Sequence, residues 1–541
     1  MPIPNPHFDE NKVVWRDEYS SRDAPPPTGY HDLSMPIGTA TTDAEGRPRE
    51  AARTASGGEV LSVALLLAVV FAINIATASL YPRVWMDEVM FTDVAANLAS
   101  GAGFHTTAWW FHDRTSFFAG YPPLYPAVLG LWIKLTGLSP TGVRSLNHVL
   151  ITLVALLAWI GVLRTNLVAS GRHRVLLVAL VALGYGMSLG YRTGRPDTLM
   201  ALLVAGLFVL FTVRAPRWRY AGLAIVSSFL PLVGMQSLPY ASMMLVLLLV
   251  FLGRQYVKEL LSIALGLGAG AVALVGLYVL NGAYDTFVAT LRSEVAGSLM
   301  NALLGQGKFH HQNTVPKDLS LLVLAMAGIA LLWKELRTEH RALRAPLIFA
   351  MTALVVIPIG MIAVGKFPTY HAWMVYLPLA VGVTSSLSSG LPGGAAARAA
   401  AALVVAACFA GLPFQLAYSA YDREDRDHGQ VVLAVSPLVR PDDWVYCDYG
   451  AYYAARNRTQ FVFTPNSQLS SDEHQKVTVI IVDPANAHSV QAALGGRWQK
   501  LGPEILPTRR MLIEDLAGIA VNFGIFDKKY RLQTYRREGT G

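Results

Sequence analysis

The sequence predicts a polytopic α-helical membrane protein with a small α/β domain at its C-terminal end. Of the 541 residues, 53% are hydrophobic and only 15% are charged, far more apolar than an average soluble domain. Apolar runs of about 17 to 25 residues, the length that crosses roughly 30 Å of hydrocarbon, recur from residue 59 to residue 417. After residue 417 the segments DDWVYCDYGAYYAAR, KVTVIIVDP and FGIFDKKYRLQTYR predict strands separated by turns.

The first 57 residues precede the apolar runs. They are polar and rich in proline, as in RDAPPPTGYHDLS, and they lack the pattern of a secretory signal peptide. Such a composition buries too little apolar surface to fold. We expect residues 1–57 to form a disordered cytosolic tail, residues 58–417 a membrane domain, and residues 418–541 an extracytoplasmic α/β domain.

About eleven segments are predicted as spanning helices. They cover residues 59–80, 143–163, 175–191, 198–213, 220–235, 238–252, 260–280, 318–333, 346–364, 371–388 and 399–417. One further segment, residues 121–137, is shorter and has three prolines near its start, which makes its status ambiguous.

The distribution of basic residues decides how segment 121–137 is placed. If it does not cross the membrane, the basic loop residues share one face, and if it crosses, most of them are exported, against the positive-inside rule. These residues are Arg164, Arg172, Arg174, Arg214, Arg217, Arg219, Arg254, Lys258, Lys334, Arg337, Arg341, Arg344 and Arg398. We therefore predict an interfacial or re-entrant helix at 121–137, a cytosolic N-terminus and an extracytoplasmic C-terminal domain.

The formal net charge is +8, but most of the basic residues lie in short loops between apolar runs. There they orient helices in the bilayer, so the charge does not indicate a nucleic-acid partner. Cys408 lies inside an apolar run and Cys447 outside one, so a disulfide between them is not expected.

The stretch WMDEVMFTDVAANLASGAGF places two adjacent carboxylates, Asp87 and Glu88, just after the first apolar run. One carboxylate in a partly dehydrated site can act as a general base toward a hydroxyl, and its neighbour can bind or orient. The alternative is a solvated pair outside the bilayer. Residues 91–104 have apolar positions at helical spacing and end near glycines, which predicts an amphipathic helix on the membrane surface.

Two more polar groups fall on the same predicted face. Arg192 and Arg195 could clamp a phosphate, with Asp197 orienting a basic partner or a hydroxyl; the alternative is interface anchoring by long basic side chains. The other group is Lys366, Tyr370 and His371 in GKFPTYH, which could neutralise and hydrogen-bond a departing phosphate.

A metal site is the weaker reading of the adjacent histidines His310 and His311 in KFHHQN. Adjacent side chains point apart in a helix or strand, and no carboxylate lies close in the sequence. We predict no metal site there, and the loop could instead cover the pocket.

The order of these motifs resembles a known superfamily. An acidic pair after the first helix is followed by A-N-L-x-x-G-x-G-F, YPPLYP, R-x-x-N, an R-P-D turn and K-x-x-x-Y. Over residues 59–417 the chain resembles the GT-C glycosyltransferases that use polyprenyl-phosphate sugars, the group of the protein O-mannosyltransferases and the lipid A aminoarabinose transferases. Relatives of the latter often have lysine before the proline pair, where this chain has Tyr121.

The resemblance implies a GT-C-like enzyme of the bacterial plasma (inner) membrane. It would move a hexose or pentose from a polyprenyl-phosphate donor to a hydroxyl of an envelope lipid, polysaccharide or protein, with inversion at the anomeric carbon. Asp87 would be the base with Glu88 beside it, and Asp197 would bound the sugar. The donor phosphate would be held by Arg192, Arg195 and Lys366. No firm cofactor is predicted, and participation of a divalent cation stays open.

Two other classes of function stay open from the sequence. A transporter or flippase of lipid-linked sugars would have charged residues near the bilayer midplane, whereas here they cluster at predicted helix ends. A non-catalytic envelope assembly protein would use the C-terminal domain to bind partners.

Overall fold

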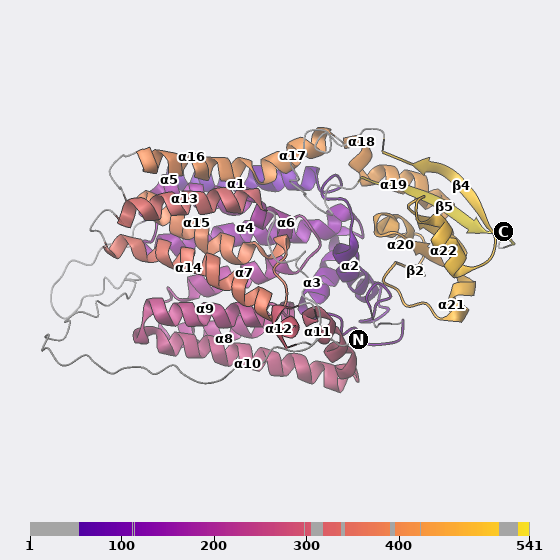
Figure 1. Ribbon diagram of the computed structural model, residues 1–541, viewed down its shortest axis with the longest axis horizontal. Helices are drawn as coiled ribbons and strands as arrows, with labels where there is room; N and C mark the ends of the chain where they lie inside the picture. Colours follow the sequence, from indigo (N-terminus) through magenta and orange to yellow (C-terminus); the bar gives the residue numbers. More distant parts are fainter. Residues whose placement is uncertain are drawn as a thin grey trace, which may run out of the picture. The chain divides into compact units, whose positions relative to one another are not determined.

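The computed structural model describes residues 54–110, 112, 114–296, 298–304, 318–336, 341–389, 395–421, 423–507 and 529–539. The predicted tail, residues 1–57, therefore lies almost entirely outside the described residues. Between residues 57 and 421 the chain forms helices (Figure 1). They are α1 (Gly57–Ala76), α2 (Met86–Ala99), α3 (Leu124–Thr136), α4 (Pro140–Thr165), α5 (Gly171–Leu183), α6 (Tyr185–Tyr191), α7 (Asp197–Leu210), α8 (Pro216–Val233), α9 (Ser237–Leu252), η1 (Arg254–Tyr256), α10 (Val257–Leu280), α11 (Tyr284–Val295), α12 (Leu299–Leu303), α13 (Leu319–Leu336), α14 (Arg341–Val364), η3 (Thr369–His371), α15 (Trp373–Ser388), α16 (Ala395–Phe409) and α17 (Leu412–Tyr421).

Several of these helices have the length and apolar composition of membrane spans. Within the described residues five segments qualify: Gly57–Ala76, Pro140–Thr165, Arg254–Leu280, Ala345–Val364 and Ala395–Tyr421. The bent pair α5 and α6 makes a sixth if it is one span, and α3, α7, α9 and α15 are shorter apolar helices. The chain is thus a multi-pass membrane protein, while the number of eleven spans stays a prediction.

The predicted helix over residues 175–191 is divided in two. Helices α5 and α6 meet at Gly184 with a bend of 49°. A side chain at Gly184 would collide with Tyr376 of α15, and a side chain at Gly411, between α16 and α17, would collide with the backbone around Gly184. Glycine at both positions therefore lets three helical segments pack closely where the bundle bends.

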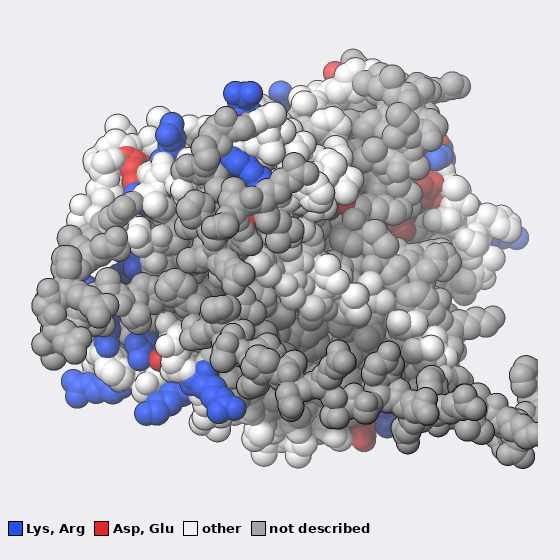
Figure 2. All heavy atoms as spheres, turned by 60° about the vertical axis from the view of Figure 1, so that its left-hand side comes forward, with Lys and Arg blue, Asp and Glu red and all other residues white. Residues whose placement is uncertain are grey.

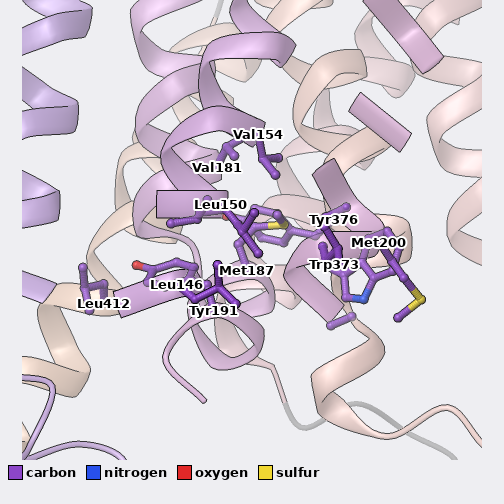
Figure 3. Packing of buried hydrophobic residues seen from close by; sticks show 14 of the residues in the cluster. Leu146, Leu150, Val154, Val181, Met187, Tyr191, Met200, Trp373, Tyr376 and Leu412 are labelled. Carbon is purple, nitrogen blue, oxygen red and sulfur yellow. The ribbon is translucent and has the colours of Figure 1, made fainter. Parts of the chain in front are cut away.

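The interior of the bundle is a continuous apolar core. Helix α4 packs against α5 and α7, and α15 packs against α5, α13 and α14. Figure 3 shows the buried side chains that fill the space between these helices. Its labelled residues are Leu146, Leu150, Val154, Val181, Met187, Tyr191, Met200, Trp373, Tyr376 and Leu412.

Basic residues gather at one end of the bundle. Figure 2 shows the visible Lys and Arg side chains mainly toward the left of the view. Exposed residues such as Arg172, Arg217 and Lys258 precede or begin α5, α8 and α10, as the positive-inside rule requires of one membrane face. Asp197 begins α7, and the basic turn with Arg214 and Arg217 follows the other end of this helix. Asp197 and this turn therefore lie a full helix length apart.

Helix α2 differs from the predicted amphipathic surface helix. Its residues from Glu88 to Asn97 are all buried, so α2 exposes no polar face over that range, and its position at a membrane surface stays a prediction. One side of α2 packs on α3, a 13-residue helix that is too short to cross about 30 Å of hydrocarbon. The polar side chains of α2 are covered by residues from the C-terminal part of the chain.

The C-terminal segments form a mixed sheet, as predicted. In the described part of the chain the sheet has five strands in the order β2-β1-β3-β5-β4. Strands β2, β1 and β3 are parallel, whereas β5 runs antiparallel to both β3 and β4. The elements are α18 (Arg423–Arg426), α19 (His428–Val435), η4 (Ser436–Leu438), β1 (Val445–Cys447), η5 (Tyr449–Ala451), α20 (Tyr452–Arg456), β2 (Val462–Phe463), α21 (Ser471–Lys476), β3 (Val479–Val482), α22 (Ala487–Leu494), β4 (Trp498–Ile505) and β5 (Leu532–Arg537).

Both cysteines are buried and free. Cys408 lies in α16 and Cys447 in β1. No disulfide was expected between them, and the structure has the two thiols in different elements.

Candidate active site

A cavity of about 560 Å³ lies at the end of the bundle where α2 begins. Five of the predicted site residues line it: Asp87, Arg195, Lys366, Tyr370 and His371. They come from three places in the chain, namely the first turn of α2, the turn between α6 and α7, and the segment around η3. The fold thus brings together polar groups up to 284 positions apart in the sequence (371 − 87).

Asp87 faces Arg195 in this cavity. Arg195 Nη1 donates a hydrogen bond to Asp87 Oδ2, and the Asp87 side chain keeps 16% of its surface exposed. The carboxylate also belongs to the first turn of α2, where the unpaired N–H groups of the helix favour negative charge. Asp87 is therefore a positioned carboxylate that stays accessible from the cavity.

Arg195 is held on three sides. Its Nε donates to Asp197 Oδ2 at 2.9 Å, and its guanidinium carbon lies 3.7 Å from the centre of the Tyr370 ring, within the range of a cation–π contact. Together with the bond to Asp87, these contacts fix the guanidinium plane at the cavity wall.

Asp197 does not line the cavity, although we predicted that it would contact substrate. It is buried, with 1% of its surface exposed, and besides Arg195 it contacts the Trp373 indole N–H at 3.3 Å and His371 Nε2 at 3.8 Å. Asp197 begins α7 and is turned into the bundle, so in this structure it anchors Arg195.

Burial lowers the pKa of His371 to about 3, with Asp197 opposing and Arg195 and Lys366 adding to the effect. The imidazole is therefore neutral near pH 7. It can hydrogen-bond a ligand in the cavity, but it does not add to the positive charge that we expected from this group.

Glu88 points away from the cavity. Arg144 donates to Glu88 Oε2 from Nη2 at 2.7 Å and from Nε at 3.0 Å, and Tyr453 donates to Oε1 at 2.8 Å. Both Glu88 and Arg144 are fully buried. Successive residues of an α-helix point about 100° apart, and here Asp87 lines the cavity while Glu88 contacts Arg144 and Tyr453.

Arg192 is also outside the cavity. It is fully buried and donates to Asn74 Oδ1, to the carbonyl oxygens of Thr77 and Tyr81, and to Thr77 Oγ1. Thr77 caps the C-terminal end of α1, where unpaired carbonyl groups favour a positive charge. Of the two arginines predicted to bind phosphate, Arg195 alone lines the cavity.

No protein-family model and no curated protein matches the sequence. Among solved structures, the chain is similar to ArnT from Cupriavidus metallidurans bound to undecaprenyl phosphate, with 12% sequence identity and a TM-score of 0.56, over 90% of this chain and 99% of that chain. The chain has the GT-C fold. The match covers 90% of the chain, which is more than residues 1–417 make up. The structural similarity therefore extends beyond the membrane helices into the C-terminal domain.

Two further structures with the GT-C fold match more loosely. They are the apo oligosaccharyltransferase of Archaeoglobus fulgidus, with 13% identity, a TM-score of 0.46 and 80% of this chain against 71% of that chain, and the arabinofuranosyltransferase AftD from Mycobacteria, with 13% identity, a TM-score of 0.44 and 87% of this chain against 40% of that chain.

Residues that sequence analysis missed lie on α20, a short helix packed against α2 of this GT-C fold. Tyr453 bonds to Glu88, Tyr452 donates to Asp93 Oδ1 at 2.7 Å, and Arg456 donates to an amide oxygen of α2 at 2.6 Å. We call these contacts the α2–α20 seam. The sequence gives little signal for these contacts, because Glu88, Asp93 and Asn97 lie five and four positions apart on α2 and do not share one face of the helix.

The cavity also has an aromatic lining that we did not predict. Phe91, Trp109, Trp110, Tyr121 and Gln236 all line it. Aromatic residues are common near membrane interfaces for general reasons, so the sequence alone could not single these out.

Metal ligands are scarce in the described part of the molecule. Among those residues there is no group of three or more His, Cys, Asp or Glu side chains that could hold a metal ion. His310 and His311 lie outside the described residues. Asp87 is the one carboxylate among the described residues that line the cavity.

Proposed function

We propose that the protein is a membrane glycosyltransferase that moves a sugar from a polyprenyl-phosphate donor to a hydroxyl of an envelope lipid, polysaccharide or protein. The observation that carries the proposal is the opposition of Asp87 and Arg195 in one cavity, with Lys366 in the same lining. A base and two cations in one cavity match the needs of a reaction in which a hydroxyl attacks and a phosphate leaves.

The proposed reaction is a single displacement. The acceptor oxygen forms a bond to the anomeric carbon while its proton passes to Asp87, and the bond from that carbon to the phosphate oxygen breaks, leaving the electron pair on polyprenyl phosphate. Attack opposite the leaving group inverts the anomeric configuration. Arg195 and Lys366 stabilise the departing phosphate, which needs charge more than it needs a proton.

The Asp87–Arg195 pair supports a link between donor binding and the base. A donor phosphate in the cavity would compete for the guanidinium that now contacts Asp87. Sharing Arg195 with the phosphate would leave Asp87 oxygen atoms open to an acceptor hydroxyl. Asp197 and Tyr370 would keep the arginine in place during this exchange.

A divalent cation would depend on the substrate for most of its ligands. Asp87 would supply one carboxylate, and phosphate and water would supply the other oxygen ligands that Mg²⁺ prefers. Turnover measured with and without a chelator tests whether a cation takes part. We propose that the reaction takes place at the extracytoplasmic face of a bacterial plasma (inner) membrane, and the position of the cavity at the bundle end away from the basic turns supports this face.

The decisive experiment follows release of undecaprenyl phosphate from a panel of undecaprenyl-phosphate hexoses and pentoses. We expect Asp87→Asn to lower turnover about a hundredfold or more, as removal of a general base does, with little change in donor affinity. Asp442→Asn, an exposed acid of the C-terminal domain, is the matched control. Donor movement across a bilayer without sugar transfer would instead identify a flippase, and binding without turnover would favour an assembly protein.

A further inference from the structure

One part of the cavity lining lies around Phe91, one helical turn beyond Asp87. Asp87 and Phe91 are four residues apart on α2, so they lie on the same face of the helix, and both line the cavity. Trp109 and Tyr121 pack against Phe91, Trp110 packs against Trp109 and Gln236 bonds to Tyr121, and all of them line the cavity. We call these five residues the aromatic end of the cavity.

The rings of the aromatic end brace one another. Phe91 meets Trp109 edge to face with ring centres 5.3 Å apart, and it meets Tyr121 in the same way at 5.0 Å. The Tyr121 carbonyl accepts a hydrogen bond of 2.9 Å from Tyr278. A side chain at Gly120 would collide with Trp109, so the loop is built to let this ring pack closely. The aromatic surface is therefore preformed.

The polar groups of the aromatic end are neutral. The Tyr121 hydroxyl donates to Gln236 Oε1, while Gln236 Nε2 is buried without a hydrogen-bond partner. Among the described residues that line the cavity, the charged side chains are Asp87, Arg195 and Lys366, and none of these belongs to the aromatic end. A buried amide N–H group that donates to no acceptor costs free energy, and a ligand oxygen that accepts its hydrogen bond would remove this cost.

The geometry points to a binding site for an uncharged sugar ring at the aromatic end. This inference rests on the proposed function and adds which part of the cavity holds the ring. A sugar has an apolar C–H face, which suits the face of an aromatic ring, and hydroxyl groups at its edge, which suit a phenol and an amide. One helical turn is about 5.4 Å, comparable to the width of such a ring, so its reacting atom would lie beside Asp87.

The ring could belong to the donor or to the acceptor, and binding measurements separate the two. We would measure the affinity of the full-length protein for undecaprenyl phosphate and for the same lipid carrying a neutral hexose or pentose, using wild type, Trp110→Ala, Gln236→Leu and Trp218→Ala. Trp110 keeps 36% of its surface exposed and Trp218 keeps 64%, so both tryptophan variants should fold, and Trp218, at the basic end of the bundle, is the control.

If the ring is the donor's, Trp110→Ala and Gln236→Leu weaken binding of the sugar-bearing lipid by about 5- to 10-fold, as for loss of one stacking or hydrogen-bonding partner. Binding of bare undecaprenyl phosphate stays the same, and Trp218→Ala changes neither. If the ring is the acceptor's, both lipids bind as before, while the KM for the acceptor rises and slow donor hydrolysis without acceptor is unchanged.

The sugar site is wrong if the variants leave donor affinity and acceptor KM unchanged, or weaken both lipids equally. Wild-type turnover in that case leaves the proposed function standing. Conversely, a wild-type protein that binds the sugar-bearing lipid without turnover would refute the proposed function. Loss of that binding in Trp110→Ala would still support the sugar site. A wild type that binds no lipid-linked sugar refutes both.

Discussion

Tyr453 donates a hydrogen bond of 2.8 Å to Glu88, the residue next to Asp87. Arg144 holds the other oxygen of the same carboxylate. Burial raises the pKa of Tyr453 well above its ordinary value, so the phenol keeps its proton and remains a donor. A residue of the C-terminal domain thus takes part in fixing the first turn of α2, on the side opposite the cavity.

We expect Tyr453→Phe to lower turnover by roughly tenfold, because an unpaired buried oxygen on Glu88 lets the first turn of α2 shift. The change should fall mainly on kcat, with donor affinity nearly unchanged, and thermal unfolding should show a loss of about 1 to 3 kcal/mol. Tyr535→Phe, in the partly exposed part of β5, serves as the control. Normal kcat with reduced stability would mean that the seam is structural only.

The buried pair Glu88–Arg144 gives a test of whether Glu88 takes part in the reaction or only stabilises the first turn of α2. Glu88→Gln or Arg144→Met alone leaves one charge unpaired in the interior, which costs about 3 to 5 kcal/mol. The double variant leaves none, and we expect it to be more stable than either single variant and to retain measurable turnover. A double variant as inactive as Asp87→Asn would show that Glu88 takes part in the chemistry.

Substitution of Arg195 should mainly change the donor KM, whereas substitution of Arg192 should mainly change stability. Arg195→Lys removes the planar group that meets Asp87, Asp197 and the Tyr370 ring, so donor KM should rise about tenfold or more in a protein of nearly normal stability. Arg192→Lys breaks several buried hydrogen bonds at the end of α1 and should lower the melting temperature with normal KM in the folded fraction. The reverse pattern would exchange the roles that the structure gives these residues.

Stability should fall as the pH is lowered because of His428. Burial lowers the pKa of this histidine from 6.5 to about 3, so the folded protein keeps it neutral while the unfolded chain takes up a proton. The contribution is complete above pH 6.5 and is lost as the pH falls toward 3, by about 2 kcal/mol at pH 5. Melting curves between pH 5 and pH 8 should show this slope in wild type and a smaller slope in His428→Gln.

The parts of the site that could be predicted are those that local patterns determine. Asp87, Arg195 and Lys366 stand at ends of apolar segments, and charges at such ends on one membrane face are brought together by alternating helix direction. The parts that could not be predicted depend on partners. Glu88 resembles Asp87 in the sequence, and what separates them is the direction of each side chain and an arginine 56 positions away.

The C-terminal domain shows the same limit. The hydrophobic pattern of KVTVIIVDP predicted β3, which is buried throughout. The segment FGIFDKKYRLQTYR predicted a final strand, which is β5 from Leu532, while its residues up to 528 lie outside the described residues. The helix α20 is five residues long, too short for a periodic signal. Its contact with α2 joins positions 359 to 365 apart in sequence, and without that contact the burial of α2 could not be foreseen.

The position of β5 has a consequence for biosynthesis. This strand lies between β3 and β4, so the sheet cannot close until residues 532–537 have been translated. Helix α2 is made hundreds of residues earlier, and its partners Tyr452 and Tyr453 on α20 are also translated before β5. We therefore expect a nascent chain arrested before residue 532 to contain the membrane helices and α20 but no closed sheet, and to be unable to turn over substrate.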